Sequence, residues 1–269
     1  MNERTLSCWE EFEDAVAMLD DQRTASRSTG TYISSLLFRG QSDSQWPLTT
    51  TLDRFCAPAE VSLLHYYRIV FLAKPRIETF TGRQWALLNV ADYIEWLATF
   101  RLGSEDEVKS TEYLAYLRHH GFPSPLLDWT QSPYIAAFFA LRHPTKCAAY
   151  FSVFAYLEWA RGHKSGTTGQ PEIRGLGPRA RVHPRHFFQQ SEYTVCLVKK
   201  ADGIFYARHQ DVFSRNSDEQ DLLWKFNVPT SERNKVLRKL VRMNVNAFSL
   251  FGSEEALLED IATTDILLA

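Results

Sequence analysis

The run from His119 to Pro133 constrains this chain more than any other, because it places turn formers and reactive side chains between two segments with helical spacing. Gly121, Pro123 and Pro125 interrupt any long regular element there. The same run holds two histidines, an aspartate, a tryptophan and several hydroxyl groups. Loops with such chemistry are more often sites than spacers, so we expect a functional loop that joins two helices.

Hydrophobic periodicity predicts helices around this run and strands later in the chain. Helical spacing is present over residues 8–20, 60–73, 84–100, 111–119, 134–142, 231–243 and 254–262. Short apolar or alternating runs predict strands over residues 32–38, 147–156, 187–199 (as one strand or a pair) and 222–228. Pro133 falls in the first turn of helix 134–142, with Ser132 or Thr130 as its expected cap. This order indicates an α+β fold.

The length of 269 residues fits one large domain or two small ones, and we expect a single domain over residues 1–269. Residues 1–30 are predicted to form an N-terminal helix and lead-in. Residues 60–118 are predicted to be a helical insertion. Residues 162–185 hold Gly, Pro, Thr and Arg without a period, which predicts a mobile loop.

Charge and cysteine usage exclude several classes of protein. The net charge of −2 gives no overall basic field for nucleic acid or membranes. The scattered Cys8, Cys56, Cys147 and Cys196 form no C-x-x-C pair, so no metal site is predicted. No apolar run approaches the roughly 18–20 residues of a membrane span. With no signal peptide recognised, we expect a cytoplasmic protein in a reducing compartment, with no membrane partner.

Arg39 is a candidate ligand-binding residue, because it ends an apolar strand and precedes Gly40. A guanidinium at a strand end can bind a pyrophosphate or carboxylate through two hydrogen bonds, and glycine lets the backbone approach closely. The alternative is that Arg39 forms a structural ion pair with Asp128 or Asp43.

The two histidines have similar alternatives. His119 and His120 either contact a phosphate or ribose and exchange protons near neutral pH, or interact with the last carbonyls of helix 111–119.

Asp128, Trp129 and Thr130 follow in the same run. Asp128 is predicted to orient Arg39 or to cap the next helix. Trp129 either stacks on a base or nicotinamide, or belongs to the core. Thr130 either caps the helix or binds the ligand.

A later strand carries Gln190, Glu192 and Thr194 on one face and Ser191 and Tyr193 on the other. If the first face lines a pocket, Gln190 and Glu192 suit the stabilisation of an oxocarbenium-like ribosyl cation and the activation of a nucleophile. The alternative for Glu192 is an exposed carboxylate on an edge strand.

Three segments, in this order, resemble the FRG domain family. They are Phe38-Arg39-Gly40-Gln41 followed by Trp46-Pro47-Leu48 and Arg54, the run from His119 to Thr130, and Gln189 to Thr194. The closing segment 243–251 also resembles the family, so the resemblance spans roughly residues 30–260. Two positions depart from the family pattern: Ser124-Pro125 stands where Thr-Arg is usual, and Arg118 where Gln is usual.

The order of these segments is also similar, more weakly, to ADP-ribosyltransferases. That resemblance implies a split mixed or antiparallel sheet with helices inserted in the N-terminal half. It implies that Arg39 anchors NAD, that Asp128, Trp129 and Thr130 shape the nicotinamide pocket, and that Glu192 contacts the ribose. The expected catalytic set is then Arg39, Gln190 and Glu192, and the expected NAD-binding set is Arg39, Gly40, Gln41, His119, Asp128, Trp129 and Thr130.

The resemblances imply an NAD-dependent ADP-ribosyltransferase-like effector of a toxin or antiviral-defence type, or an NAD glycohydrolase. NAD would be its substrate, and no metal is expected. Its partners would be a macromolecular target, either protein or nucleic acid, and an antitoxin or another defence component. Two alternatives stay open: a non-catalytic nucleotide- or phosphate-binding module, and an RNA-cleaving toxin.

Overall fold

The computed structural model describes residues 1–27, 30–56, 61–98, 105–143, 145, 147–166, 168–177 and 185–269. Within these residues, eight strands form one mixed sheet in the order β1-β8-β4-β2-β3-β6-β5, and β7 also pairs with β6. Among the strands of the described residues, only β1 and β8 form a parallel pair. The strands are β1 (Asn2–Thr5), β2 (Leu36–Gln41), β3 (Leu127–Thr130), β4 (Tyr150–Trp159), β5 (Glu172–Gly175), β6 (Ser191–Lys200), β7 (Gly203–Tyr206) and β8 (Gln220–Pro229).

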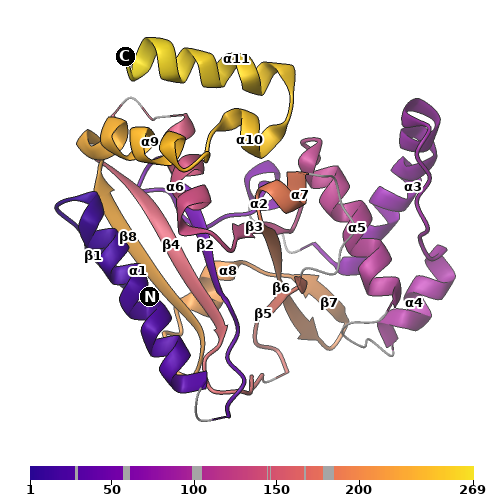
Figure 1. Cartoon of the computed structure of the whole chain (residues 1–269). Helices are drawn as coiled ribbons and strands as arrows, with labels where there is room; N and C mark the ends of the chain where they lie inside the picture. The colour runs from indigo at the N-terminus through magenta and orange to yellow at the C-terminus, as the bar shows by residue number, and fades with distance from the viewer. Residues whose placement is uncertain are drawn as a thin grey trace.

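The helices surround this sheet, with the C-terminal pair above it in Figure 1. Those in the first half of the chain are α1 (Trp9–Arg27), α2 (Thr51–Phe55), α3 (Leu63–Thr81), α4 (Val90–Ala98), α5 (Glu105–His119) and α6 (Pro133–Arg142). The others are α7 (Arg185–Phe188), α8 (His209–Phe213), α9 (Arg233–Arg242), α10 (Ala247–Phe251) and α11 (Glu254–Ala262). No helix in the described segments is long and apolar enough to span a bilayer.

The sheet is divided where β2 meets β3. β2 pairs with β4 along its whole length, but it pairs with β3 only through Phe38 and Thr130. Figure 1 shows β8, β4 and β2 on the left of the sheet and β6, β5 and β7 on the right. The two halves therefore meet at a narrow junction, and a split in a sheet exposes strand ends to a ligand.

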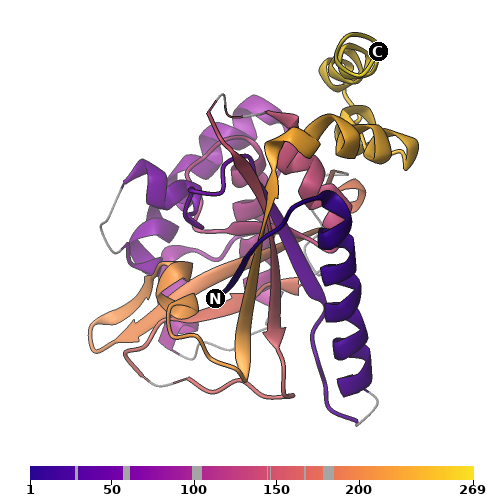
Figure 2. The same cartoon turned by 90° about the vertical axis from the view of Figure 1, so that its left-hand side faces the viewer.

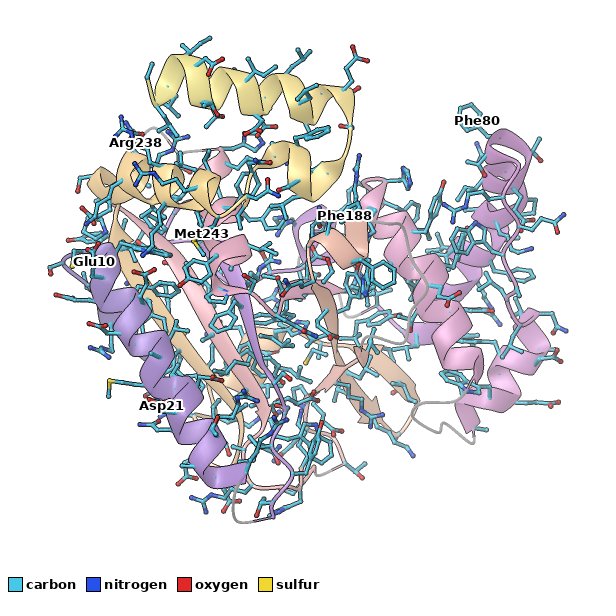
Figure 3. The ribbon with its side chains drawn as sticks, viewed as in Figure 1. Glu10, Asp21, Phe80, Phe188, Arg238 and Met243 are labelled. Atoms are coloured by element: carbon cyan, nitrogen blue, oxygen red, sulfur yellow. The ribbon has the colours of Figure 1, made fainter. Side chains whose placement is uncertain are left out.

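Apolar faces on both sides of the sheet form the core. On one face of β8, β4 and β2, α1, α6 and α9 bury Trp9, Phe12, Phe138 and Leu237 against Phe226. Figure 2 shows α1 lying along these strands, and Figure 3 shows Glu10 and Asp21 on its outer side. This arrangement is what an amphipathic helix requires.

The other clusters hold the second half of the sheet. α3 and α5 pack on one face of β6 through Leu63, Ala115 and Tyr193. On the opposite face, Trp129, Tyr156 and Phe213 join a separate cluster. Each side of β6 is thus buried by a different set of residues.

The predicted α+β class is confirmed, and all seven predicted helices are present, most of them with shifted ends. The predicted strand at 32–38 begins only at Leu36. The run 187–199 contains the end of helix α7 followed by one strand, β6. Gln190, with a φ of 46°, lies between them and interrupts the extended backbone. The predicted mobile loop at 162–185 contains β5, whereas residue 167 and residues 178–184 of that loop lie outside the described residues.

The largest difference concerns Asp128, Trp129 and Thr130, which were expected in a loop and form strand β3. Leu127 and Trp129 point into the core, so the run does alternate. The prolines on both sides concealed this short alternation in the sequence.

Candidate functional site

A cavity of about 970 Å³ lies at the split between β2 and β3. Its walls come from β2 and the loop after it, α2, the end of α5, β3, α6, α7, the start of β6 and α10. All the residues predicted to bind NAD line it: Arg39, Gly40, Gln41, His119, Asp128, Trp129 and Thr130. The fold thus brings together residues that lie about ninety positions apart in the chain.

One end of the cavity holds three arginines around one carboxylate. Arg118 Nη2 lies 2.5 Å from Asp128 Oδ2. Arg39 Nη1 donates to the backbone carbonyl of Asp128 at 2.7 Å and lies 3.9 Å from its Oδ2. Arg54 lines the same end and donates to Thr49 O at 2.8 Å. We call Arg39, Arg54, Arg118 and Asp128 the arginine cluster.

The arginine cluster keeps an excess of positive charge. Burial lowers the pKa of Arg39 to about 10; Asp128 opposes this effect, and Arg118 and Arg54 add to it, so Arg39 stays protonated at neutral pH. Burial alone would raise the pKa of Asp128, but Arg118 and Arg39 hold it below its ordinary value. The Nε atoms of Arg39 and Arg118 are buried without a hydrogen-bond partner among the described residues. This end therefore offers donors and charge to an anion.

The structure shows the ion pair expected of Arg39, whereas ligand binding by Arg39 stays a prediction. Its guanidinium contacts Asp128, as the ion-pair alternative requires, and it also lines the cavity, as ligand binding requires. Arg118, at one of the positions that depart from the FRG pattern, was not predicted as a site residue. No local sequence signal distinguishes it, because its partner Asp128 lies beyond the turn that ends α5.

Gly40 serves packing between helix and strand. A Cβ atom at Gly40 would lie 1.9 Å from Ala136 O and 2.8 Å from Ala140 N, so only glycine fits where α6 crosses β2. The close approach expected of this glycine is real, but its partner is the backbone of a helix.

The two histidines have different surroundings. His119 Nε2 lies 2.9 Å from Tyr193 Oη, and both residues line the cavity. Burial raises the pKa of Tyr193, which keeps its hydroxyl protonated. His120 is exposed, packs its ring on Tyr116 at 4.3 Å and does not line the cavity.

Trp129 and Thr130 lie on opposite faces of β3. The indole Nε1 of Trp129 donates to Thr194 Oγ1 at 2.8 Å, and its ring stacks on Tyr156 at 5.1 Å. The structure therefore favours the alternative in which this ring belongs to the core. Thr130 Oγ1 donates to Gln189 O at 2.7 Å, and Ser132 caps α6 by accepting from Ile135 N.

Gln190 and Glu192 do not line the cavity. Glu192 is buried and accepts from Gln131 Nε2 at 2.8 Å, and burial raises its pKa. Ser191 and Tyr193 of β6 are the residues that line the cavity. Gln190, predicted to share a strand face with Glu192, lies before β6 with a φ of 46° and is not part of the strand. The expectation that Gln190 and Glu192 face the pocket is thus corrected, because the period of a strand does not say which face is turned to a ligand.

The other end of the cavity was missed entirely from the sequence. It is formed by Phe139 and Arg142 of α6, Arg185 of α7 and Phe251 of α10. These residues come from segments separated by up to 112 positions. Phe139 and Arg142 fall in a predicted helix, Arg185 ends the predicted loop 162–185, and Phe251 lies between two predicted helices. Of these residues, only Phe251 lies in a segment, 243–251, that the sequence analysis singled out.

Comparisons with known proteins found a family match for one part of the chain. Residues 34–149 match the family model of the FRG domain, and this range holds β2, α2 to α6 and β3, and with them the whole arginine cluster. No curated protein and no solved structure gave a match. The resemblance to the FRG domain is thereby confirmed over residues 34–149. The resemblance to ADP-ribosyltransferases received no support.

Proposed function

We propose that the protein binds a phosphorylated nucleotide in the cavity at the split of the sheet, with NAD as the first ligand to test. The observation that carries this proposal is the arginine cluster, where Arg39 and Arg118 contact the one carboxylate of Asp128 and Arg54 adds a third cation to the same cavity. Arginine binds phosphate oxygens with paired, charge-assisted hydrogen bonds. A cavity of about 970 Å³ is also large enough for a ligand of dinucleotide size.

The roles within the cluster follow from its contacts. Asp128 orients Arg118 through its carboxylate and Arg39 through its backbone carbonyl. The guanidinium groups of Arg39 and Arg118, which line the cavity, would donate to the phosphate oxygens of the ligand. Charge-assisted hydrogen bonds of this kind are stronger than hydrogen bonds between neutral groups.

Whether the ligand is also turned over separates two candidate functions. Transfer of ADP-ribose to a macromolecule, or hydrolysis of NAD, is what the ADP-ribosyltransferase resemblance implies. A binding module without chemistry is favoured by one observation: the carboxylate of Glu192 lies away from the cavity. An RNA-cleaving activity has less support, because of the two neighbouring histidines only His119 lines the cavity.

Titration calorimetry of the purified protein with NAD and ADP-ribose tests the binding proposal. We expect Arg39→Ala and Arg118→Ala each to weaken binding by about 10- to 100-fold, the loss of one or two charged hydrogen bonds. Arg161→Ala, which removes an exposed arginine outside the cavity, is the matched control. Absence of binding to the folded wild-type protein would refute the proposal.

Turnover is measured separately, as nicotinamide release and as transfer of labelled ADP-ribose to cell lysate or nucleic acid. Turnover by the wild-type protein separates the two candidates, and Glu192→Gln tests whether this carboxylate is catalytic. If Glu192 is catalytic, this change abolishes turnover and leaves affinity unchanged. If the protein is a binding module, neither the wild-type protein nor Glu192→Gln turns NAD over, and both bind it equally.

A further inference from the structure

The cavity has a second end, between α6 and α10, whose chemistry differs from that of the arginine cluster. The rings of Phe139 and Phe251 meet edge to face with centroids 6.0 Å apart. The guanidinium carbon of Arg142 lies 4.1 Å from the centroid of the Phe251 ring, and that of Arg185 lies 5.4 Å from it. This end is therefore built from aromatic rings and planar cations; we call it the aromatic end.

The arginines of the aromatic end are held in place by the protein. Arg142 donates to Glu259 through Nε at 2.7 Å and through Nη2 at 2.6 Å, a two-point ion pair with α11. Arg185 Nε donates to Phe251 O at 3.2 Å. Glu259 balances the charge of Arg142, and Arg185 interacts electrostatically with Glu255, so this end offers flat surfaces more than uncompensated charge.

From this arrangement we infer that the aromatic end binds the nucleobase of the ligand, while the arginine cluster binds its phosphates. The inference rests on the proposed function and specifies how the ligand lies. Bases stack on aromatic rings and on arginine guanidinium planes, whereas phosphates need excess positive charge. The two ends of the cavity provide these two environments separately.

The inference gives the C-terminal helices a part in the site. Phe251 ends α10, and Glu259 lies in α11, both far beyond the range 34–149 that matches the FRG domain. Gln189 Nε2 also donates to Leu250 O at 3.1 Å, which ties α10 to the segment before β6. The base would thus be bound partly by residues outside the matched range, together with Phe139 and Arg142 inside it.

The test compares ADP, ribose 5-phosphate and pyrophosphate by titration calorimetry on the full-length protein. We expect wild-type protein to bind ADP at least about tenfold more tightly than pyrophosphate. Phe251→Leu and Phe251→Ala should weaken ADP binding by about tenfold and leave pyrophosphate binding within about twofold. Phe248→Ala is the matched control, because Phe248 lies on the same helix, is 46% exposed and does not line the cavity.

Arg142→Lys provides a second variant, which leaves both aromatic rings in place. It keeps a cation for Glu259 but removes the guanidinium plane. It should therefore also weaken the binding of ADP and leave the binding of pyrophosphate unchanged. Thermal unfolding shows whether each variant is folded, and Phe251→Leu is the variant expected to keep the packing of α10.

The outcomes separate this inference from the proposed function. If wild-type protein binds pyrophosphate as tightly as ADP, or if the Phe251 variants weaken both ligands equally, the aromatic end does not bind the base and phosphate binding still stands. If neither ADP nor pyrophosphate binds, the proposed function itself fails. The inference is supported if Phe251→Leu and Arg142→Lys each weaken the binding of ADP and not that of pyrophosphate.

Discussion

Asp128 shows how single residues serve both structure and site in this protein. Its carboxylate holds Arg118, its carbonyl holds Arg39, and its backbone pairs with Tyr193 of β6. The side chain is 36% exposed, so it faces the cavity while it orders the cations around it. Structural and functional interpretations of such a residue are compatible, because a ligand site needs its charged groups held in place.

Gly40 gives the sharpest prediction at the scale of a residue. Gly40→Ala should lower the free energy of unfolding by about 3 kcal/mol or more, because the new methyl group would overlap Ala136 O and force α6 away from β2. Urea unfolding measures the effect. Gly166→Ala is the control: its Cβ would meet only the Glu172 side chain at 3.5 Å, and it should change stability by no more than about 0.5 kcal/mol. Equal stabilities of the two variants would contradict the packing role.

At the scale of elements, β3 and α10 decide where the cavity lies. β3 joins the two halves of the sheet through one residue pair to β2 and four to β6, and this imbalance leaves the split. α10 closes the far side, fixed by Gln189 and by the capping box in which Asn246 and Ser249 bond each other. Each of these elements is short, so tertiary contacts rather than local propensity hold it.

The ion pair between α6 and α11 makes a prediction about an element. Glu259→Gln removes the charge that Arg142 pairs with, and the two side chains are 22% and 28% exposed, so we expect a loss of about 1 kcal/mol in stability. The loss should be local. In Glu259→Gln, hydrogen exchange should become faster in residues 254–262 and remain unchanged in α1. Asp20→Asn, which removes an exposed carboxylate from an ion pair within α1, is the matched control variant and should leave exchange in α11 unchanged. If α11 exchanges at the same rate in Glu259→Gln as in the wild-type protein, other contacts hold the helix.

At the scale of the whole molecule, buried titratable groups couple stability to pH. His209 is almost fully buried, and its Nε2 lies 2.9 Å from Thr194 Oγ1. Burial, with a contribution from Arg39, lowers the pKa of His209 to about 3. In the unfolded chain, His209 has an ordinary pKa of about 6.5. Between pH 6.5 and 3, His209 is therefore protonated in the unfolded chain and neutral in the folded protein.

It follows that stability falls as the pH is lowered from about 6 towards 3, by up to about 1.4 kcal/mol per pH unit from His209 alone. Asp128 adds to the loss at the acid end, because its lowered pKa in the folded state favours folding only while it is ionised. His209→Gln should flatten the profile between about pH 6 and 4, as measured by urea unfolding across pH. Parallel profiles of the two proteins would exclude His209 as the source.

Much of this protein follows from local patterns in its sequence. The periods of hydrophobic residues located most helices and the long strands, and the Ser132-Pro133 pair located the start of α6. The FRG-like segments indicated that Arg39, His119 and Asp128 belong together, and all three line the cavity. Such features are readable because they depend on neighbours within a few residues or on a motif that spans the whole segment.

Only the tertiary structure decided which face of each strand meets the cavity. Alternation grouped Glu192 with Thr194 and Tyr193 with Ser191, yet the split of the sheet turned the second pair inward. The same split took the Trp129 ring into the core and brought Arg118, Arg142 and Phe251 to the cavity wall. A period specifies residues that share a face, but packing between distant segments determines what that face touches. The sequence by itself therefore determined the candidate groups, and the fold determined which of them meet.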